Sequence, residues 1–214
     1  NEATDHLACF LGAGAYRHYI PAAVNAIISR GEFYTAYTPY QPEVSQGTLQ
    51  AIFEFQTLVA NLTGMDVSNA SHYDGATAAA EAGIMAYHHF RGKRRKILLS
   101  SAVNPQYREV MCSYLCGYEN LELVTHEGAK GCMEDPDELA DLIDDQTALV
   151  LVQYPDFFGR LFDFQNLIQK AHQAGSLIAM VVNPTALGIL KTPGEMGADI
   201  VVGEGQTMGL PLSF

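Results

Sequence analysis

Ala148-Leu149-Val150-Leu151-Val152-Gln153 is apolar at almost every position over the length of a strand, and this run decides the fold class. A strand that is apolar on both faces is typical of a parallel sheet that helices cover on each side. Similar short runs lie before and after it, and longer stretches with apolar residues at helical spacing separate them. Since right-handed crossovers connect such units, the sequence predicts an α/β fold, with a mostly parallel, open sheet and helices on both faces.

The expected elements alternate between strand and helix along most of the chain. We expect strands at 70–72, 96–100, 121–125, 148–153, 177–182 and 199–202, and helices at 21–30, 48–63, 75–90, 105–116, 135–143 and 164–173. Gly31 is expected to end the first helix and Gly64 the second. Ligands of such sheets bind at the carboxyl ends of the strands, so we expect a site formed by the loops after Ser71, Ser100, Gln153 and Val182.

The composition argues against some classes of function. The chain has 214 residues, of which 48% are hydrophobic and 17% charged, and this is enough for one sizeable core. A net charge of −12 and a pI near 4.8 argue against nucleic acid and an anionic membrane surface as partners. No apolar run reaches the roughly 18 residues that span a bilayer, and residues 6–14 lack the basic leader and cleavage pattern of a signal peptide. We expect the single basic cluster, at 93–96, to be a solvated turn rather than a binding patch.

The four cysteines of the chain are Cys9, Cys112, Cys116 and Cys132. Cys112 and Cys116 lie four residues apart on an expected helix, beside Met111 and Leu115. We therefore expect core thiols; a metal pair stays open, but no further ligands follow at a recognisable spacing. The seven histidines form no ligand spacing either, so no metal site is predicted. Free thiols indicate a reducing compartment, and we expect a cytoplasmic protein.

A stretch rich in tyrosine and proline lies between the first two expected helices. It reads Tyr34-Thr35-Ala36-Tyr37-Thr38-Pro39-Tyr40-Gln41-Pro42-Glu43-Val44-Ser45-Gln46-Gly47. Its two prolines fix the backbone and hold the loop extended. A rigid loop with aromatic, hydroxyl and amide groups suits a small polar ligand or a partner surface, and an ordinary surface loop is the alternative.

That stretch, read with Asn69-Ala70-Ser71-His72-Tyr73-Asp74-Gly75-Ala76-Thr77-Ala78-Ala79-Ala80-Glu81-Ala82, closely resembles the glycine decarboxylase family, the P-protein of the glycine cleavage system. The resemblance covers essentially the whole chain and points to P-protein subunit 1 of organisms in which the protein is split in two. It implies the large-domain fold of pyridoxal-phosphate (PLP) dependent transferases of the aspartate aminotransferase type. It also implies a longer complete subunit, of which residues 1–214 are a single large domain, truncated at both ends, without the smaller C-terminal domain.

The resemblance implies an oxidoreductase reaction that needs several chains. Glycine is decarboxylated with PLP, and the remaining aminomethyl group passes to the lipoyl group of the carrier H-protein. The PLP lysine is expected on P-protein subunit 2, so that the enzyme is a heteromer (a heterotetramer) and the isolated chain is inactive. A self-sufficient PLP enzyme and a non-catalytic scaffold with a degenerate PLP-enzyme fold are the competing interpretations.

Three groups that hold PLP in this fold are missing from their expected positions. No carboxylate follows the strand at 177–182 to pair with the pyridinium nitrogen, and no aromatic ring stands in 101–105. No lysine follows the strand at 199–202 to form the Schiff base. Lys191 precedes that strand and is expected to be a surface turn residue. We therefore expect no catalytic residue and no cofactor on this chain alone.

The cofactor phosphate has a recognisable position at the start of the alanine-rich helix. A cradle is expected there, in degenerate form, at Gly75, Ala76 and Thr77, because backbone N–H groups at a helix N-terminus bind anions. The alternative is a helix cap, in which Asp74 or Thr77 satisfies the free N–H groups of the first turn.

Residues of the tyrosine- and proline-rich loop are expected to form a wall of the shared active site. Their hydroxyl and amide groups would donate and accept hydrogen bonds, and the glutamate would orient an amine or fix the loop. The predicted wall residues are Thr35, Tyr37, Tyr40, Gln41 and Glu43. For each tyrosine the alternative is packing, with its hydroxyl bonded to backbone.

Overall fold

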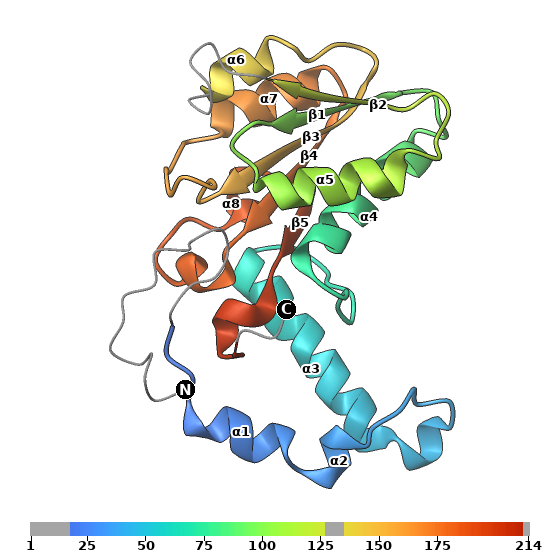
Figure 1. Ribbon diagram of the computed structural model, residues 1–214, viewed down its shortest axis with the longest axis vertical. Helices are drawn as coiled ribbons and strands as arrows, with labels where there is room; N and C mark the ends of the chain where they lie inside the picture. Colours follow the sequence, from blue (N-terminus) through green and yellow to red (C-terminus); the bar gives the residue numbers. More distant parts are fainter. Residues whose placement is uncertain (1–17, 127–134, 212–214) are drawn as a thin grey trace.

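The computed structural model describes residues 18–126 and 135–211, with a sheet of five parallel strands at its centre (Figure 1). The strands are β1 (Lys96–Ser100), β2 (Glu122–His126), β3 (Thr147–Tyr154), β4 (Leu177–Val182) and β5 (Ile200–Gly203). Their order across the sheet is β2-β1-β3-β4-β5, and every neighbouring pair is parallel. The α-helices are α1 (Ala22–Ile28), α2 (Gly31–Tyr34), α3 (Gln46–Thr63), α4 (Gly75–His89), α5 (Pro105–Leu115), α6 (Pro136–Ala140), α7 (Gln165–Gln173) and α8 (Pro193–Met196). Within the described residues there are also three short 3-10 helices, η2 (Pro42–Val44), η3 (Pro184–Gly188) and η4 (Gly205–Met208).

The strands bury apolar side chains on both faces of the sheet. On one face Leu98, Val150 and Met180 pack against α6 and α7. On the other face Leu99 and Leu151 pack against α4 and α5. Successive residues of a strand point to opposite faces, so a strand covered on both sides is apolar throughout. The predicted parallel sheet with helices on both faces is confirmed.

An N-terminal arm, formed by α1, α2, η2 and α3, extends away from the sheet (Figure 1). Helix α3 has 18 residues, yet only Ala60 and Thr63 are buried, both in its last turn. Phe53 and Leu58 leave 66% and 67% of their surface exposed. The helix predicted at 48–63 is therefore confirmed, but the described part of the chain covers only part of its broad apolar face.

Helix α3 ends where its backbone meets α8. Gly64 caps α3 with φ of 72°, in the left-handed region, and the predicted glycine stop is confirmed. A Cβ added to Gly194 of α8 would overlap the carbonyl oxygen of Gly64. The carbonyl oxygen belongs to the backbone and a Cβ is bonded directly to it, so neither atom can rotate aside as the end of a side chain could.

This close approach makes Gly194→Ala costly. The variant is expected to lose about 1–3 kcal/mol of unfolding free energy, because overpacking shifts the backbone. The measurement is the melting temperature of the full-length subunit. Gly188→Ala on η3 is the matched control, since nothing lies within 4 Å of its added Cβ. Equal melting temperatures for the two variants would show that the approach of α8 to α3 is not tight.

Two local predictions are wrong. Residues 70–72 form no strand, because the Ser71 N–H donates to Asn69 Oδ1 at 3.1 Å and Ser71 has φ of 107°. This local turn competes with sheet pairing. Gly31 does not end the first helix either: α1 already ends at Ile28, and Gly31 begins α2.

The basic cluster at 93–96 is not a solvated turn throughout. Arg94 is half-buried, and its guanidinium donates to the carbonyl oxygens of Thr147 at 2.8 Å and Ala174 at 2.7 Å. The same guanidinium lies 4.9 Å from the centroid of the Phe90 ring. The prediction is therefore wrong for Arg94, which ties the start of β1 to the first residue of β3 and to the segment that precedes β4.

Candidate functional site

The tyrosine- and proline-rich loop presents its rings to solvent. Tyr34, Tyr37 and Tyr40 leave 82%, 82% and 78% of their surface exposed. The rings of Tyr37 and Tyr40 lie side by side, with centroids 6.3 Å apart and planes tilted by 51°. Their packing within the chain, the alternative raised by the sequence, is therefore not observed. The Thr35 hydroxyl donates to the Gly31 carbonyl oxygen and so helps to end α2.

An open hollow of about 390 Å³ lies beside the same loop. It is lined by Arg30, Glu32, Phe33, Val44, Ser45, Gly47 and Thr48. Arg30 and Glu32 form an exposed ion pair at 2.7 Å on its rim. The volume is that of an ordinary small-molecule pocket, but the five predicted wall residues do not line it.

The N-terminus of α4 is capped by the chain's own carboxylates. The Thr77 N–H donates to Asp74 Oδ1 at 2.7 Å, and the Asp74 N–H donates to Thr77 Oγ1 at 3.2 Å. This reciprocal capping box confirms the cap interpretation of these residues. The Gly75 N–H donates to Glu204 Oε2 at 3.0 Å. The first and third N–H groups of the predicted cradle are thus already bonded.

The other predicted cofactor positions are also engaged within the chain. Asn183, at the end of β4, accepts hydrogen bonds from the Thr185 N–H at 3.1 Å and the Thr207 hydroxyl at 3.2 Å. The backbone N–H of Asn104, in the loop after β1, donates to Gln153 Oε1 at 2.8 Å. No lysine stands in the segment after β5. These residues do not fit PLP. The phosphate cradle is filled, an asparagine replaces the carboxylate that would pair with the pyridinium nitrogen, and the lysine that would form the Schiff base is missing.

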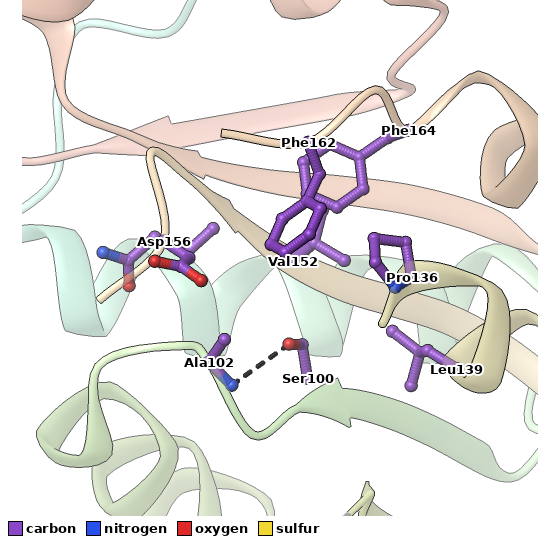
Figure 2. A pocket seen from close by; sticks show the side chains of 9 residues that line it. Ser100, Ala102, Pro136, Leu139, Val152, Asp156, Phe162 and Phe164 are labelled. Carbon is purple, nitrogen blue, oxygen red and sulfur yellow. Dashed lines mark hydrogen bonds between the residues drawn. The ribbon is translucent and has the colours of Figure 1, made fainter. Parts of the chain in front are cut away.

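The reversal of strand order between β1 and β3 is where such sheets usually bind ligands, and here side chains fill it (Figure 2). Phe162 and Phe164 lie beside Val152 of β3, and together with Ser100 at the end of β1 they line one small cavity. The remaining cavity is about 10 Å³, close to the least that holds one water molecule. Asp156 is buried beside it and accepts from Arg160 Nε at 2.6 Å. This crevice is therefore part of the core.

The two sets of predicted site residues are separated along α3. The tyrosine- and proline-rich loop precedes the first turn of α3, and the cradle lies near the other end of that helix, beside the sheet (Figure 1). An 18-residue helix is about 27 Å long at 1.5 Å per residue. The chain therefore does not bring its wall residues and its cradle into one site.

The cysteine prediction is wrong where the structure describes it. Cys112 and Cys116 are exposed and free rather than buried in the core. The two cysteines lie on the exposed side of α5, whereas Met111 and Leu115 are its buried residues. Among the residues that the structure describes, no group of three or more histidine, cysteine, aspartate or glutamate side chains could hold a metal ion. Residues 6–14, Cys9 and Cys132 lie outside the described residues.

No helix within 18–126 and 135–211 is long and apolar enough to cross a bilayer.

Sequence reasoning missed two residues at the cradle, Glu204 and Tyr107. A Cβ added to Gly75 would overlap the hydroxyl group of Tyr107 from α5. The sequence held a signal for Glu204, because Gly203-Glu204-Gly205 places an acid between two glycines where the family resemblance implies a lysine. It held none for Tyr107, whose distance in sequence from Gly75 says nothing about contact.

The five-stranded parallel sheet and its helices define the large-domain fold of PLP-dependent enzymes of the aspartate aminotransferase type, as predicted. A NifS-like protein has this fold, with a TM-score of 0.71 at 13% identity over 94% of this chain and 55% of that protein. A cysteine desulfurase from Escherichia coli has it too, with a TM-score of 0.67 at 16% identity over 93% of this chain and 52% of that protein.

Within this class the chain belongs to the glycine cleavage system P-protein family, whose sequence model matches residues 1–214. Proteins named probable glycine dehydrogenase (decarboxylating) subunit 1 are 54% identical to it, over 219 residues in Desulforamulus reducens and 214 in Lysinibacillus sphaericus. Each match covers 100% of this chain and 47% of the relative, so the chain spans about half the length of these relatives. A crystal structure of glycine decarboxylase (P-protein) in inhibitor-bound form has a TM-score of 0.85 at 45% identity, over 96% of this chain and 45% of that protein.

Proposed function

We propose that this chain is part of subunit 1 of a decarboxylating glycine dehydrogenase. The enzyme would remove CO2 from glycine and pass the aminomethyl group to the lipoyl group of an H-protein. The observation that carries the proposal is the match to subunit 1 relatives, at 54% identity over the full length of this chain. Residues 1–214 would form most of one large domain, with a smaller C-terminal domain in the rest of the subunit.

The cofactor of this reaction would be held by the partner, P-protein subunit 2. PLP acts as an electron sink for the bond that breaks. This chain is unsuited to hold it, because Glu204 is bonded to the cradle, Asn183 replaces the carboxylate and no lysine follows β5. No step of the reaction is therefore assigned to a cofactor on this chain.

The arm is proposed to face the partner subunit. Its exposed apolar side chains are Ile27, Ile28, Phe33, Val44, Phe53, Phe55 and Leu58. Burial of apolar area drives association, and aromatic side chains are enriched in the buried parts of interfaces. Monomeric proteins rarely expose so large an apolar surface on one extended arm. The exposed, free thiols of Cys112 and Cys116 suit a reducing, cytoplasmic location for the complex.

The tyrosine- and proline-rich loop would form a wall of the partner's active site. Thr35, Tyr37, Tyr40, Gln41 and Glu43 are all exposed at the tip of the arm, where a docked partner would cover them. Tyr37 and Tyr40 form one tilted ring pair, so a ligand could meet both hydroxyl groups. A chain that acted only as a scaffold would not need these polar groups on a stiff loop.

The test is turnover of the reconstituted enzyme with loop variants. Tyr37→Phe, Tyr40→Phe and Gln41→Ala are each combined with subunit 2, PLP and lipoyl H-protein. Loss of one hydrogen bond made in the transition state is expected to slow CO2 release about ten- to a hundredfold, from about 1.5–3 kcal/mol. The melting temperature is expected to change little, because an exposed substitution costs only about half a kcal/mol.

Tyr114→Phe is the matched control, an exposed tyrosine on α5 rather than on the loop. It is expected to turn over at the wild-type rate. Variants that melt early yet keep normal turnover per folded enzyme would assign the loop a structural role. A wild-type complex that releases no CO2 from glycine would refute the proposed function itself.

A further inference from the structure

We propose that Glu204 is a built-in anion, a carboxylate that occupies the phosphate position at the N-terminus of α4. It follows β5 directly, and its partner Gly75 lies 129 residues earlier in the chain. The chain's own carboxylate then occupies the cradle, and a phosphate group cannot bind at the same position.

One carboxylate serves two helix starts. Glu204 Oε2 accepts from the Gly75 N–H at 3.0 Å, and Oε1 accepts from the Gln206 N–H at 3.2 Å, in the first turn of η4. A helix N-terminus carries a partial positive charge and unpaired N–H groups, which is why it binds anions. α4 has 15 residues, and the contact observed there is made by a charged oxygen of the chain itself.

The surroundings of Glu204 disfavour a second anion at this position. Asp74 already holds the Thr77 N–H at 2.7 Å, so two carboxylates approach the first turn of α4. On the other side, the Tyr107 hydroxyl lies against Gly75. A phosphate would have to displace Glu204 and would meet the negative charge of Asp74 at close range, which raises its cost.

The same contact has a mechanical consequence. β5 is the last strand of the sheet, and Glu204 joins the segment after it to α4. In an enzyme with a bound cofactor, the phosphate would contribute to that connection. Here a side chain supplies it, so this connection between β5 and α4 needs no ligand.

The test uses Glu204→Ala in the full-length subunit. Loss of the charged hydrogen bonds is expected to lower the melting temperature by about 3–8 °C. Sodium formate or inorganic phosphate is then expected to restore at least half of this loss, because an anion that binds only the folded state stabilises it. Sodium chloride at equal ionic strength separates this effect from screening. Calorimetry with inorganic phosphate is expected to give saturable binding to the variant and none to the wild type.

Two further variants keep the test decisive. Glu109→Ala removes an exposed glutamate from α5 and is expected to show neither the loss nor the restoration. Glu204→Gln keeps an oxygen acceptor without the charge, so it remains measurable if the alanine variant does not fold. The proposal fails if Glu204→Ala and Glu204→Gln both have the same melting temperature as the wild type. It also fails if the wild type gains as much from phosphate or formate as the variants do. None of these measurements depends on glycine turnover, so they stand or fall apart from the proposed function.

Discussion

The full-length subunit that carries this chain is expected to release no CO2 from glycine when it is assayed alone. The cradle is filled by Glu204, Asn183 bonds to its neighbours, and no lysine stands in residues 203–214, where the Schiff-base lysine is expected. Addition of subunit 2, PLP and lipoyl H-protein is expected to raise turnover to on the order of 1–10 per second, the range of ordinary enzymes. The measurement is labelled CO2 released from carboxyl-labelled glycine.

The location of the cofactor can be tested in the same mixture. Borohydride reduction followed by peptide mapping is expected to find PLP attached to the partner chain. Lys191 is exposed and precedes α8, so Lys191→Ala is expected to leave turnover unchanged. Turnover by the single subunit, or stoichiometric PLP on Lys191, would refute the heteromer.

The sheet could be predicted from the sequence because its signal is local. The strands expected at 96–100 and 177–182 coincide with β1 and β4. The run of β4 is apolar throughout and that of β1 is apolar at its three central residues, and burial on both faces stabilises such strands. Gly64 likewise ends α3 as expected, since a left-handed backbone is easiest for glycine.

The burial and the contacts of a side chain could not be predicted where they depend on segments that are distant in the sequence. Cys112 and Cys116 sit on the exposed side of α5 because Met111 and Leu115 take the buried side, and a four-residue spacing does not say which side faces the sheet. The exposure of the apolar face of α3 could not be predicted either, because it depends on which other segments pack against the arm. Family resemblance gave the place of the cradle, but its occupant, Glu204, becomes visible only when the end of β5 is brought to α4.

Arg94→Met is expected to destabilise the subunit more than any other single change considered above. The Arg94 guanidinium donates to Thr147 O at 2.8 Å, to Ala174 O at 2.7 Å and to Ser176 Oγ at 3.3 Å. Hydrogen bonds from a charged donor contribute about 1.5–3 kcal/mol each. Arg94 is only half-buried and Thr147 O keeps a second donor, the Ser176 hydroxyl at 2.8 Å, so the expected loss is about 2–4 kcal/mol.

The loss is measured as the change in unfolding free energy of the full-length subunit in urea. Arg95→Met is the matched control, because Arg95 is exposed and its Nε donates only to the nearby Gly92 carbonyl oxygen, at 3.1 Å; its expected effect is within about 0.5 kcal/mol. Arg94→Lys is expected to recover only part of the loss, since a single ammonium group cannot span carbonyl groups that the planar guanidinium reaches together. If Arg94→Met and Arg95→Met unfold at the same urea concentration, then the guanidinium does not hold the start of β1 against the first residue of β3 and the segment before β4.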